Sequence, residues 1–96
     1  FFFFFIRVRV LEILDCDDDS GFIQLYSYEV YRFDKKLYWY DPFPHPHILE
    51  LASTEPHHKH VLPDIKHSRI PAPNIKFNQP NLPFLIREVE TEFLTD

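Results

Sequence analysis

The chain has 96 residues, a length that suits one domain and is too short for two. Its hydrophobic content of 45% and aromatic content of 18% exclude intrinsic disorder as the main state of the chain. The 15 acidic residues outnumber the 10 Lys and Arg residues, and the resulting net charge of -5 argues against a strongly basic, non-specific nucleic-acid binder. A local cationic site is still compatible with this charge.

The opening apolar run, residues 1–6, is too short to span a bilayer and lacks the features of a secretory signal. Its five consecutive Phe are either a buried strand or an artefact of the sequence itself. The single cysteine, Cys16, excludes a disulfide framework and fits a reducing compartment, and its four Asp neighbours argue against a nucleophilic thiolate. We expect a soluble, cytoplasmic protein without membrane contact, whose natural N-terminus precedes Phe1.

Residues 1–41 contain no proline and are predicted to form strands. Ile6, Val8 and Val10 alternate with arginines, which is the period of a half-buried strand. The alternation breaks at residues 11–13, which indicates either a bulge or a strand buried on both faces. The acidic segment 15–21 is predicted to be a solvated turn, since it lacks the later glutamate of a calcium loop.

Residues 22–33 and 37–40 are predicted to form a hairpin around a turn at residues 34–36. Tyr26, Tyr28 and Val30 share one face of the first of these strands. An aromatic stripe at this spacing is more often part of a core than a platform for stacked bases, and no basic stripe lies between the rings. We therefore assign these side chains to the core.

All 9 prolines and all 6 histidines lie between residues 42 and 83. The prolines remove strand hydrogen-bond donors, so residues 42–80 are predicted to be loops and edge segments, with short edge strands at 48–51 and 59–62. Residues 81–94 are predicted to form a helix capped by Asn81, whose apolar positions recur at helical spacing and end at Phe93. This amphipathic helix either packs on the sheet, which we favour, or binds a partner.

These elements predict an α+β fold in a single domain, residues 1–96. The fold class is a mainly antiparallel β-sheet meander with a Pro/His-rich loop region and a C-terminal amphipathic helix. Strands occupy residues 1–41, loops and edge strands occupy 42–80, and the helix occupies 81–94.

Five of the six histidines lie within residues 45–60. Residues two apart in extended chain face the same way, so His45 can point with His47 and His58 with His60, while His57 points away. Two such pairs on adjacent segments could hold zinc or another transition metal. The spacing matches none of the strong zinc signatures, since no Cys and no HExxH helix accompanies these residues.

The same histidines suit acid–base catalysis at neutral pH, because the ordinary imidazole pKa lies near 6.5. Residues 57–69 form the one cationic island of the chain, and Lys59, Lys66 and Arg69 could contact a phosphate there. A third interpretation is a set of exposed loop histidines without a ligand. Asp41 either orients one histidine or is a turn residue ahead of Pro42, and we favour the turn.

Several of these segments resemble the TumE family. The resemblance rests on YSY at residues 26–28, a turn at Asp34, Leu37, YD at 40–41, PH at 44–45 and a complete PHHKH at 56–60. It covers about residues 22–62, and PHHKH is its specific part. TumE proteins are small prokaryotic proteins, generally encoded beside a helix-turn-helix antitoxin and assigned as toxins of toxin–antitoxin pairs.

The chain departs from the family pattern at several positions. The family has His where this chain has Glu29, and Arg where it has Trp39. The family segment DNAPHH is replaced by DPFPHP at residues 41–46, and His47 stands near the lost second His. A diverged member would still be expected to have a helix-turn-helix antitoxin as its partner.

The resemblance and the cationic island together imply a toxin-like growth inhibitor that acts on RNA. From the His-rich motif we extend this expectation to a metal-independent endoribonuclease, with no cofactor. His58 and His60 would be its acid–base pair and Lys59 its phosphate contact, with His57, His45 and His47 assisting. The substrate-binding candidates are Lys66, Arg69 and Tyr40. The alternative is a non-catalytic protein in which His45, His47, His58 and His60 hold a metal ion or shape a partner-binding face. The exposed aromatic edge is also compatible with a homo-oligomer.

Overall fold

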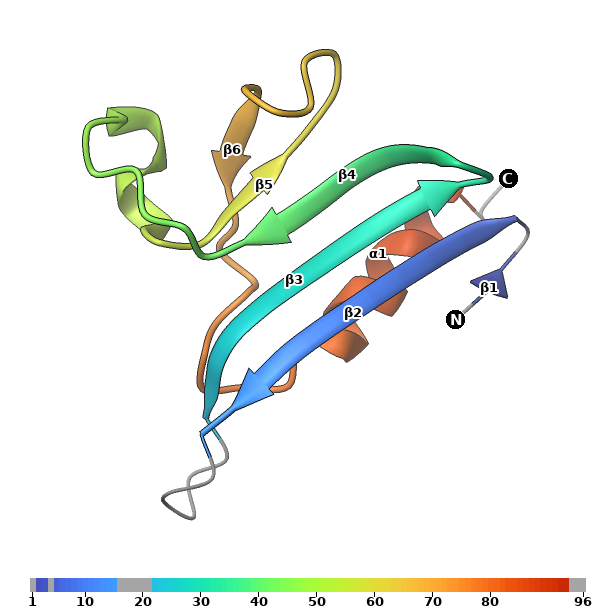
Figure 1. Ribbon diagram of the computed structural model, residues 1–96, viewed down its shortest axis with the longest axis horizontal. Coiled ribbons are helices and arrows are strands. Elements are labelled where there is room, and N and C mark those ends of the chain that lie inside the picture. Colours follow the sequence, from blue (N-terminus) through green and yellow to red (C-terminus); the bar gives the residue numbers. More distant parts are fainter. Residues whose placement is uncertain (1, 4, 16–21, 94–96) are drawn as a thin grey trace.

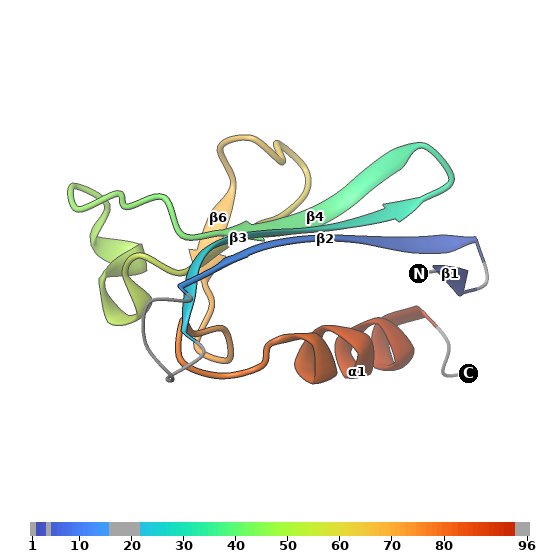
Figure 2. The same cartoon turned by 60° about the horizontal axis from the view of Figure 1, so that its bottom comes forward.

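A computed structural model describes residues 2–3, 5–15 and 22–93 of the chain. Its described strands form one antiparallel sheet in the order β1-β2-β3-β4-β5-β6, so each strand pairs with its neighbours in sequence, and helix α1 covers one face (Figures 1 and 2). This arrangement confirms the predicted α+β class and the antiparallel meander. The elements are β1 (Phe2–Phe3), β2 (Ile6–Leu14), β3 (Ile23–Arg32), β4 (Lys35–Asp41), the 3-10 helix η1 (Leu49–Thr54), β5 (His58–His60), β6 (Arg69–Pro71) and α1 (Leu82–Phe93).

The alternation in β2 and β3 places one set of apolar side chains beneath the sheet. Tyr26, Tyr28 and Val30 of β3 are buried together with Ile6 and Val8 of β2. This confirms that the tyrosine stripe belongs to the core and is not a base-stacking platform. Burial of these rings and branched chains is the main source of stability for the sheet.

The alternation of apolar and polar residues breaks along β2, and the structure tests the two interpretations of that break. The register with β3 is regular through Ile13 and shifts only between Ile13 and Leu14, so the irregularity lies beyond the residues where the alternation breaks. Leu11 and Ile13 are 55% and 44% exposed, so the interpretation of a strand buried on both faces is wrong. Among the described residues, no helix lies over this part of the sheet on the side away from α1 (Figures 1 and 2).

Helix α1 is amphipathic and packs on the sheet, as predicted. Its buried residues are Leu85 and Val89, one helical turn apart. Asn81 accepts the Leu85 amide through its backbone carbonyl, as a residue at the helix start does. Its buried side chain is hydrogen-bonded to Tyr28 and to Lys76, so it anchors the preceding loop to the core.

The Pro/His-rich region contains both predicted and unpredicted elements. Residues 48–51 were expected to be an edge strand, but Leu49–Thr54 form η1, which buries Leu51 while Leu49 is 84% exposed. The second expected edge strand is β5, which begins one residue earlier than the predicted segment 59–62. Strand β6 was not expected, since only three residues form it, and Pro71 is tolerated there because β6 is the last strand of the sheet.

The described helices include none that is long and apolar enough to cross a membrane. The acidic turn predicted at residues 15–21 and Cys16 lie almost wholly outside the described residues, which resume at Phe22.

The core assignment predicts unequal costs for the same substitution at two leucines. Leu85→Ala should lower the free energy of unfolding by about 2–5 kcal/mol, because it leaves a cavity at a fully buried position. Leu49→Ala should change it by less than about 0.5 kcal/mol, because that side chain is exposed. Urea unfolding followed by tyrosine fluorescence measures both values. Equal losses would contradict the packing of α1 on the sheet.

Candidate functional site

The two faces of the sheet carry different chemistry. Directly opposite residues in an antiparallel sheet share a face, and Asp41 lies opposite His58 while Trp39 lies opposite His60. These four side chains are therefore on the face away from α1. Tyr40 lies opposite Lys59, and both point to the face that α1 covers.

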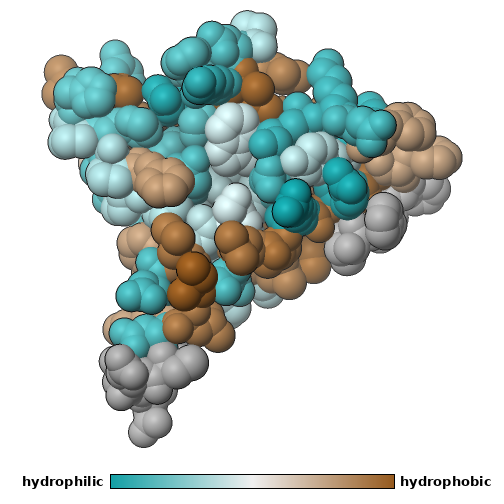
Figure 3. Space-filling view, in the orientation of Figure 1, coloured by the Kyte–Doolittle hydropathy of each residue, from teal (hydrophilic) through white to brown (hydrophobic). Residues whose placement is uncertain are grey.

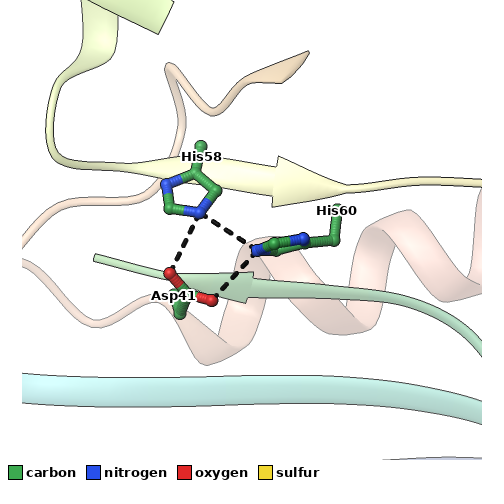
Figure 4. A group of neighbouring side chains, drawn as sticks. All are labelled: Asp41, His58 and His60. Atoms are coloured by element: carbon green, nitrogen blue, oxygen red, sulfur yellow. Dashed lines mark hydrogen bonds and ion pairs between the residues drawn. The ribbon is translucent and has the colours of Figure 1, made fainter. Parts of the chain in front are cut away.

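Asp41, His58 and His60 form one compact cluster, which we call the Asp–His–His site (Figure 4). His58 Nε2 is 3.0 Å from Asp41 Oδ1, and His60 Nε2 is 3.1 Å from Asp41 Oδ2. The two Nε2 atoms are 3.1 Å from each other. The side chains are 11% exposed for Asp41, 1% for His58 and 6% for His60, so the site is almost fully shielded from water.

The other nitrogen of each imidazole is held by the backbone. His58 Nδ1 lies 3.1 Å from the Pro56 carbonyl oxygen, and His60 Nδ1 lies 3.0 Å from the Ile65 carbonyl oxygen. A carbonyl can only accept, so each Nδ1 must carry the proton of its hydrogen bond. A neutral imidazole then has its lone pair on Nε2, which means that two lone pairs and a carboxylate converge on one point.

The buried charges of the site shift the pKa values of its members. Burial by itself would raise the pKa of Asp41, but hydrogen bonds from His58 and His60 hold it well below its usual range. Burial would lower the pKa of His58, but Asp41 outweighs that effect and raises it. The cluster therefore favours an ionised carboxylate beside a positive charge.

Trp39 and His45 enclose the site. The Trp39 ring stacks on His60 with centroids 3.8 Å apart, and its Nε1 donates to Asp41 Oδ2 at 2.9 Å. The His45 ring meets the His58 ring edge to face at 4.9 Å, and burial beside Arg69 lowers the pKa of His45. His47 contacts His45 at 6.2 Å and is otherwise exposed.

Arg69 supplies a cation on the face of the site. It lies opposite His60 in the pairing of β5 with β6, so it shares the face of the site. Its charge counteracts protonation of both His45 and His58. Arg69 is thus the predicted substrate-binding residue that the fold brings to the histidines.

Lys59, the expected phosphate contact, is on the opposite face. Its Nζ pairs with Glu88 Oε2 of α1 at 3.2 Å and lies 4.2 Å above the Tyr38 ring. Tyr40 donates to the same Glu88 oxygen at 2.7 Å. Successive side chains of a strand point to opposite faces of the sheet, so Lys59 must lie on the other face from His58 and His60. Lys66, the other predicted contact, is exposed in the loop between β5 and β6.

His57 lies apart from the Asp–His–His site, as the alternation predicted. Its Nδ1 is 2.7 Å from the Tyr26 hydroxyl, and its ring packs 4.6 Å from Phe77. Burial and the neighbouring His58 lower its pKa. It lines a cleft of about 540 Å³ that also includes Phe22 and Lys76.

Asp41 is the site residue that sequence reasoning ranked too low. The turn favoured for it exists, since Asp41 Oδ1 accepts the Phe43 amide at 3.1 Å. The same carboxylate also orients both histidines, which was the interpretation given second place. The signal was a carboxylate at the end of a strand next to the PHHKH segment, but only the pairing of β4 with β5 brings the two together. Trp39 was not expected at the site, and it lies opposite Glu29, the other departure from the family pattern.

Comparison with known proteins gives one match. A family model described as Toxin TumE matches residues 1–93. No curated protein matches the chain, and no solved structure matches it.

The backbone contacts predict the tautomers of the two site histidines. In protein labelled with ¹⁵N-histidine, Nδ1 of both His58 and His60 should carry a proton, because each donates to a carbonyl. Long-range ¹H–¹⁵N spectra distinguish the two ring nitrogens. The exposed His47 is the internal reference for an unconstrained ring. An unprotonated Nδ1 at His58 or His60 would contradict the described site.

Proposed function

The chain belongs to the TumE toxin family, and on that premise we propose that this toxin of a toxin–antitoxin system arrests growth by cleaving RNA at the Asp–His–His site. An antitoxin is the partner that such a toxin requires, and we propose one of the helix-turn-helix type. The observation that carries the catalytic proposal is the convergence of His58 and His60 on Asp41 beside Arg69. These are the base, acid, orienting carboxylate and cation that phosphodiester cleavage requires.

We assign His58 the role of general acid, because its contact with Asp41 at 3.0 Å raises its pKa and favours the protonated ring. His60 Nε2 accepts the proton of a ribose 2′-hydroxyl as its oxygen attacks the adjacent phosphorus. The bond from phosphorus to the 5′ oxygen breaks, and His58 Nε2 gives its proton to that leaving oxygen. The products are a 2′,3′-cyclic phosphate and a free 5′-hydroxyl. Asp41 holds both rings, and Arg69 stabilises the charge on the phosphate.

Access to the site constrains this mechanism. The His58 side chain is 1% exposed, and His45 packs against its ring. A phosphate therefore reaches His58 only when the segment that carries His45, between β4 and η1, moves aside. Closure of that segment over the substrate would then exclude water from the reaction.

A second candidate for the same residues is a metal centre. Both Nδ1 atoms are held by carbonyls, so the neutral site presents two imidazole nitrogens 3.1 Å apart, and each of them lies 3.0–3.1 Å from one oxygen of the Asp41 carboxylate. A metal ion with bonds of about 2.0–2.2 Å to N and O ligands has ligand atoms roughly 3.0–3.5 Å apart in octahedral or tetrahedral geometry. Two imidazoles and one carboxylate suit zinc or another transition metal. The ligand set then replaces the predicted His47 by Asp41 and keeps His45 as the nearest further imidazole.

The catalytic proposal predicts loss of function in a His58→Gln, His60→Gln double variant. RNA cleavage by the purified protein should fall by about two to four orders of magnitude, because the proton transfers are lost. Induction of this variant in a bacterial host should no longer arrest growth. His67→Gln, at an exposed histidine away from the site, is the matched control and should behave as wild type. Full cleavage by a folded double variant would disprove the assignment.

The metal candidate predicts a stoichiometric ion in protein purified without a His tag. Elemental analysis should find about one equivalent of zinc or another transition metal per chain, since three protein ligands bind such ions strongly. Asp41→Asn and His58→Gln should each remove it, and His67→Gln should not. Cleavage that persists in a chelator, by protein that holds no metal, assigns the proton-transfer mechanism instead.

A further inference from the structure

The face of the sheet opposite α1 carries, beside His60 and Arg69, further residues that the proposed reaction does not use. The register aligns Arg7, Tyr31 and Lys36 across β2, β3 and β4. The next row runs across all strands from β2 to β6 and consists of Arg9, Glu29, Trp39, His60 and Arg69. We call these two rows the open face. None of the described helices covers it (Figure 2), and it is the face toward the viewer in Figures 1 and 3.

Cations and aromatic rings alternate along the open face. The Arg7 guanidinium carbon lies 4.5 Å above the Tyr31 ring. Lys36 Nζ lies 5.8 Å from the same ring and 4.6 Å from the Trp39 ring. Trp39 in turn stacks on His60. The line from Arg7 through Trp39 therefore leads directly into the Asp–His–His site.

The open face is cationic on a chain of net charge -5. Its two rows contain four Lys or Arg residues against Glu29 as their single acid. Arg7 and Arg69, near its two ends, each have a buried Nε that finds no hydrogen-bond acceptor among the described residues. Neither guanidinium forms an ion pair with a described carboxylate, so its charge is available to a phosphate. Figure 3 shows that hydrophilic side chains cover the middle of this face and that hydrophobic ones gather along the end of β2.

We propose that the open face binds single-stranded RNA and guides it into the Asp–His–His site. This inference rests on the proposed function and adds the surface that holds the substrate. Single strands stack their bases on exposed aromatic rings of a sheet while cations contact the backbone. Five strands at a spacing of about 4.8 Å give a width of about 19 Å, which suits a few nucleotides.

Substitution of Glu29 is expected to change RNA affinity in the direction opposite to the other substitutions. It pairs with Lys36 at 2.6 Å and with Arg9 at 3.9 Å, and it accepts a hydrogen bond from Tyr31 at 2.8 Å. Its carboxylate therefore neutralises the cations that an RNA backbone would contact. Removal of that charge should strengthen RNA binding, whereas mere disruption of the sheet would weaken it.

The experiment measures fluorescence anisotropy of a labelled 12-nucleotide RNA with 2′-O-methyl riboses, which lacks the attacking hydroxyl. Wild type should bind with a Kd of about 1–100 µM near 0.1 M salt. Tyr31→Ala should weaken binding about fivefold or more, through lost stacking. Arg7→Ala should reduce the slope of log Kd against log salt by about 0.7. Glu29→Gln should lower Kd, and Arg87→Ala, a charge-matched change at an exposed position of α1, should match wild type.

Two outcomes would overturn the proposal. One is the absence of binding by wild-type protein at 1 mM. The other is that Arg7→Ala, Tyr31→Ala and Glu29→Gln retain the wild-type Kd for RNA and the wild-type salt slope. If these variants lose antitoxin binding while RNA binding is unchanged, this face is a protein interface. Wild type that binds this RNA but cleaves no natural RNA disproves the proposed function and leaves the RNA-binding face intact. Cleavage of natural RNA that is unchanged in Arg7→Ala, Tyr31→Ala and Glu29→Gln disproves the RNA-binding face and leaves the proposed function intact.

Discussion

The Asp41 carboxylate is the interaction on which the candidate site depends. It stands at the last residue of β4, lies within 3.1 Å of Nε2 of both histidines of β5, and accepts hydrogen bonds from Trp39 and from the Phe43 amide. A buried carboxylate without such donors would be strongly unfavourable, so the four contacts and the charge stabilise one another. They also fix the strand ends, the Trp39 ring and the start of the loop that carries His45. Loss of Asp41 would therefore disturb position and chemistry together.

The alternation of strand β5 separates stability from function. His58 and His60 point to the open side of the sheet, while Lys59 between them points to α1 and meets Glu88 and the rings of Tyr38 and Tyr40. A motif that looks like a single cluster of charge in sequence thus serves two surfaces. Lys59 forms an ion pair that links α1 to the sheet, and His58 and His60 form the Asp–His–His site. Arg69, from the neighbouring strand, takes the place of Lys59 as the cation of the site.

The helix covers one face of the sheet and leaves the other free. On the covered face, tyrosines and branched residues form the core, and Asn81 links the core to the loop before α1. On the open face, cations, Tyr31 and Trp39 lead toward buried imidazoles. A toxin with an acidic overall charge can recognise a polyanion in this way, because binding depends on the local field and not on the net charge.

The sequence by itself determined the class of fold, the tyrosine core, the amphipathic helix and the pairing of His58 with His60, since each follows from a local period of two or of helical spacing. It also contained the PHHKH segment, whose family the match over residues 1–93 confirms. Only the tertiary structure decided that Asp41 orients both histidines, that Lys59 belongs to α1 and that Arg69 adjoins the site. These facts depend on which strands pair and in what register, and pairing between distant segments leaves no local period in the chain. Residues 49–54 form a 3-10 helix for a similar reason, because burial of Leu51 outweighs the short apolar run that suggested a strand.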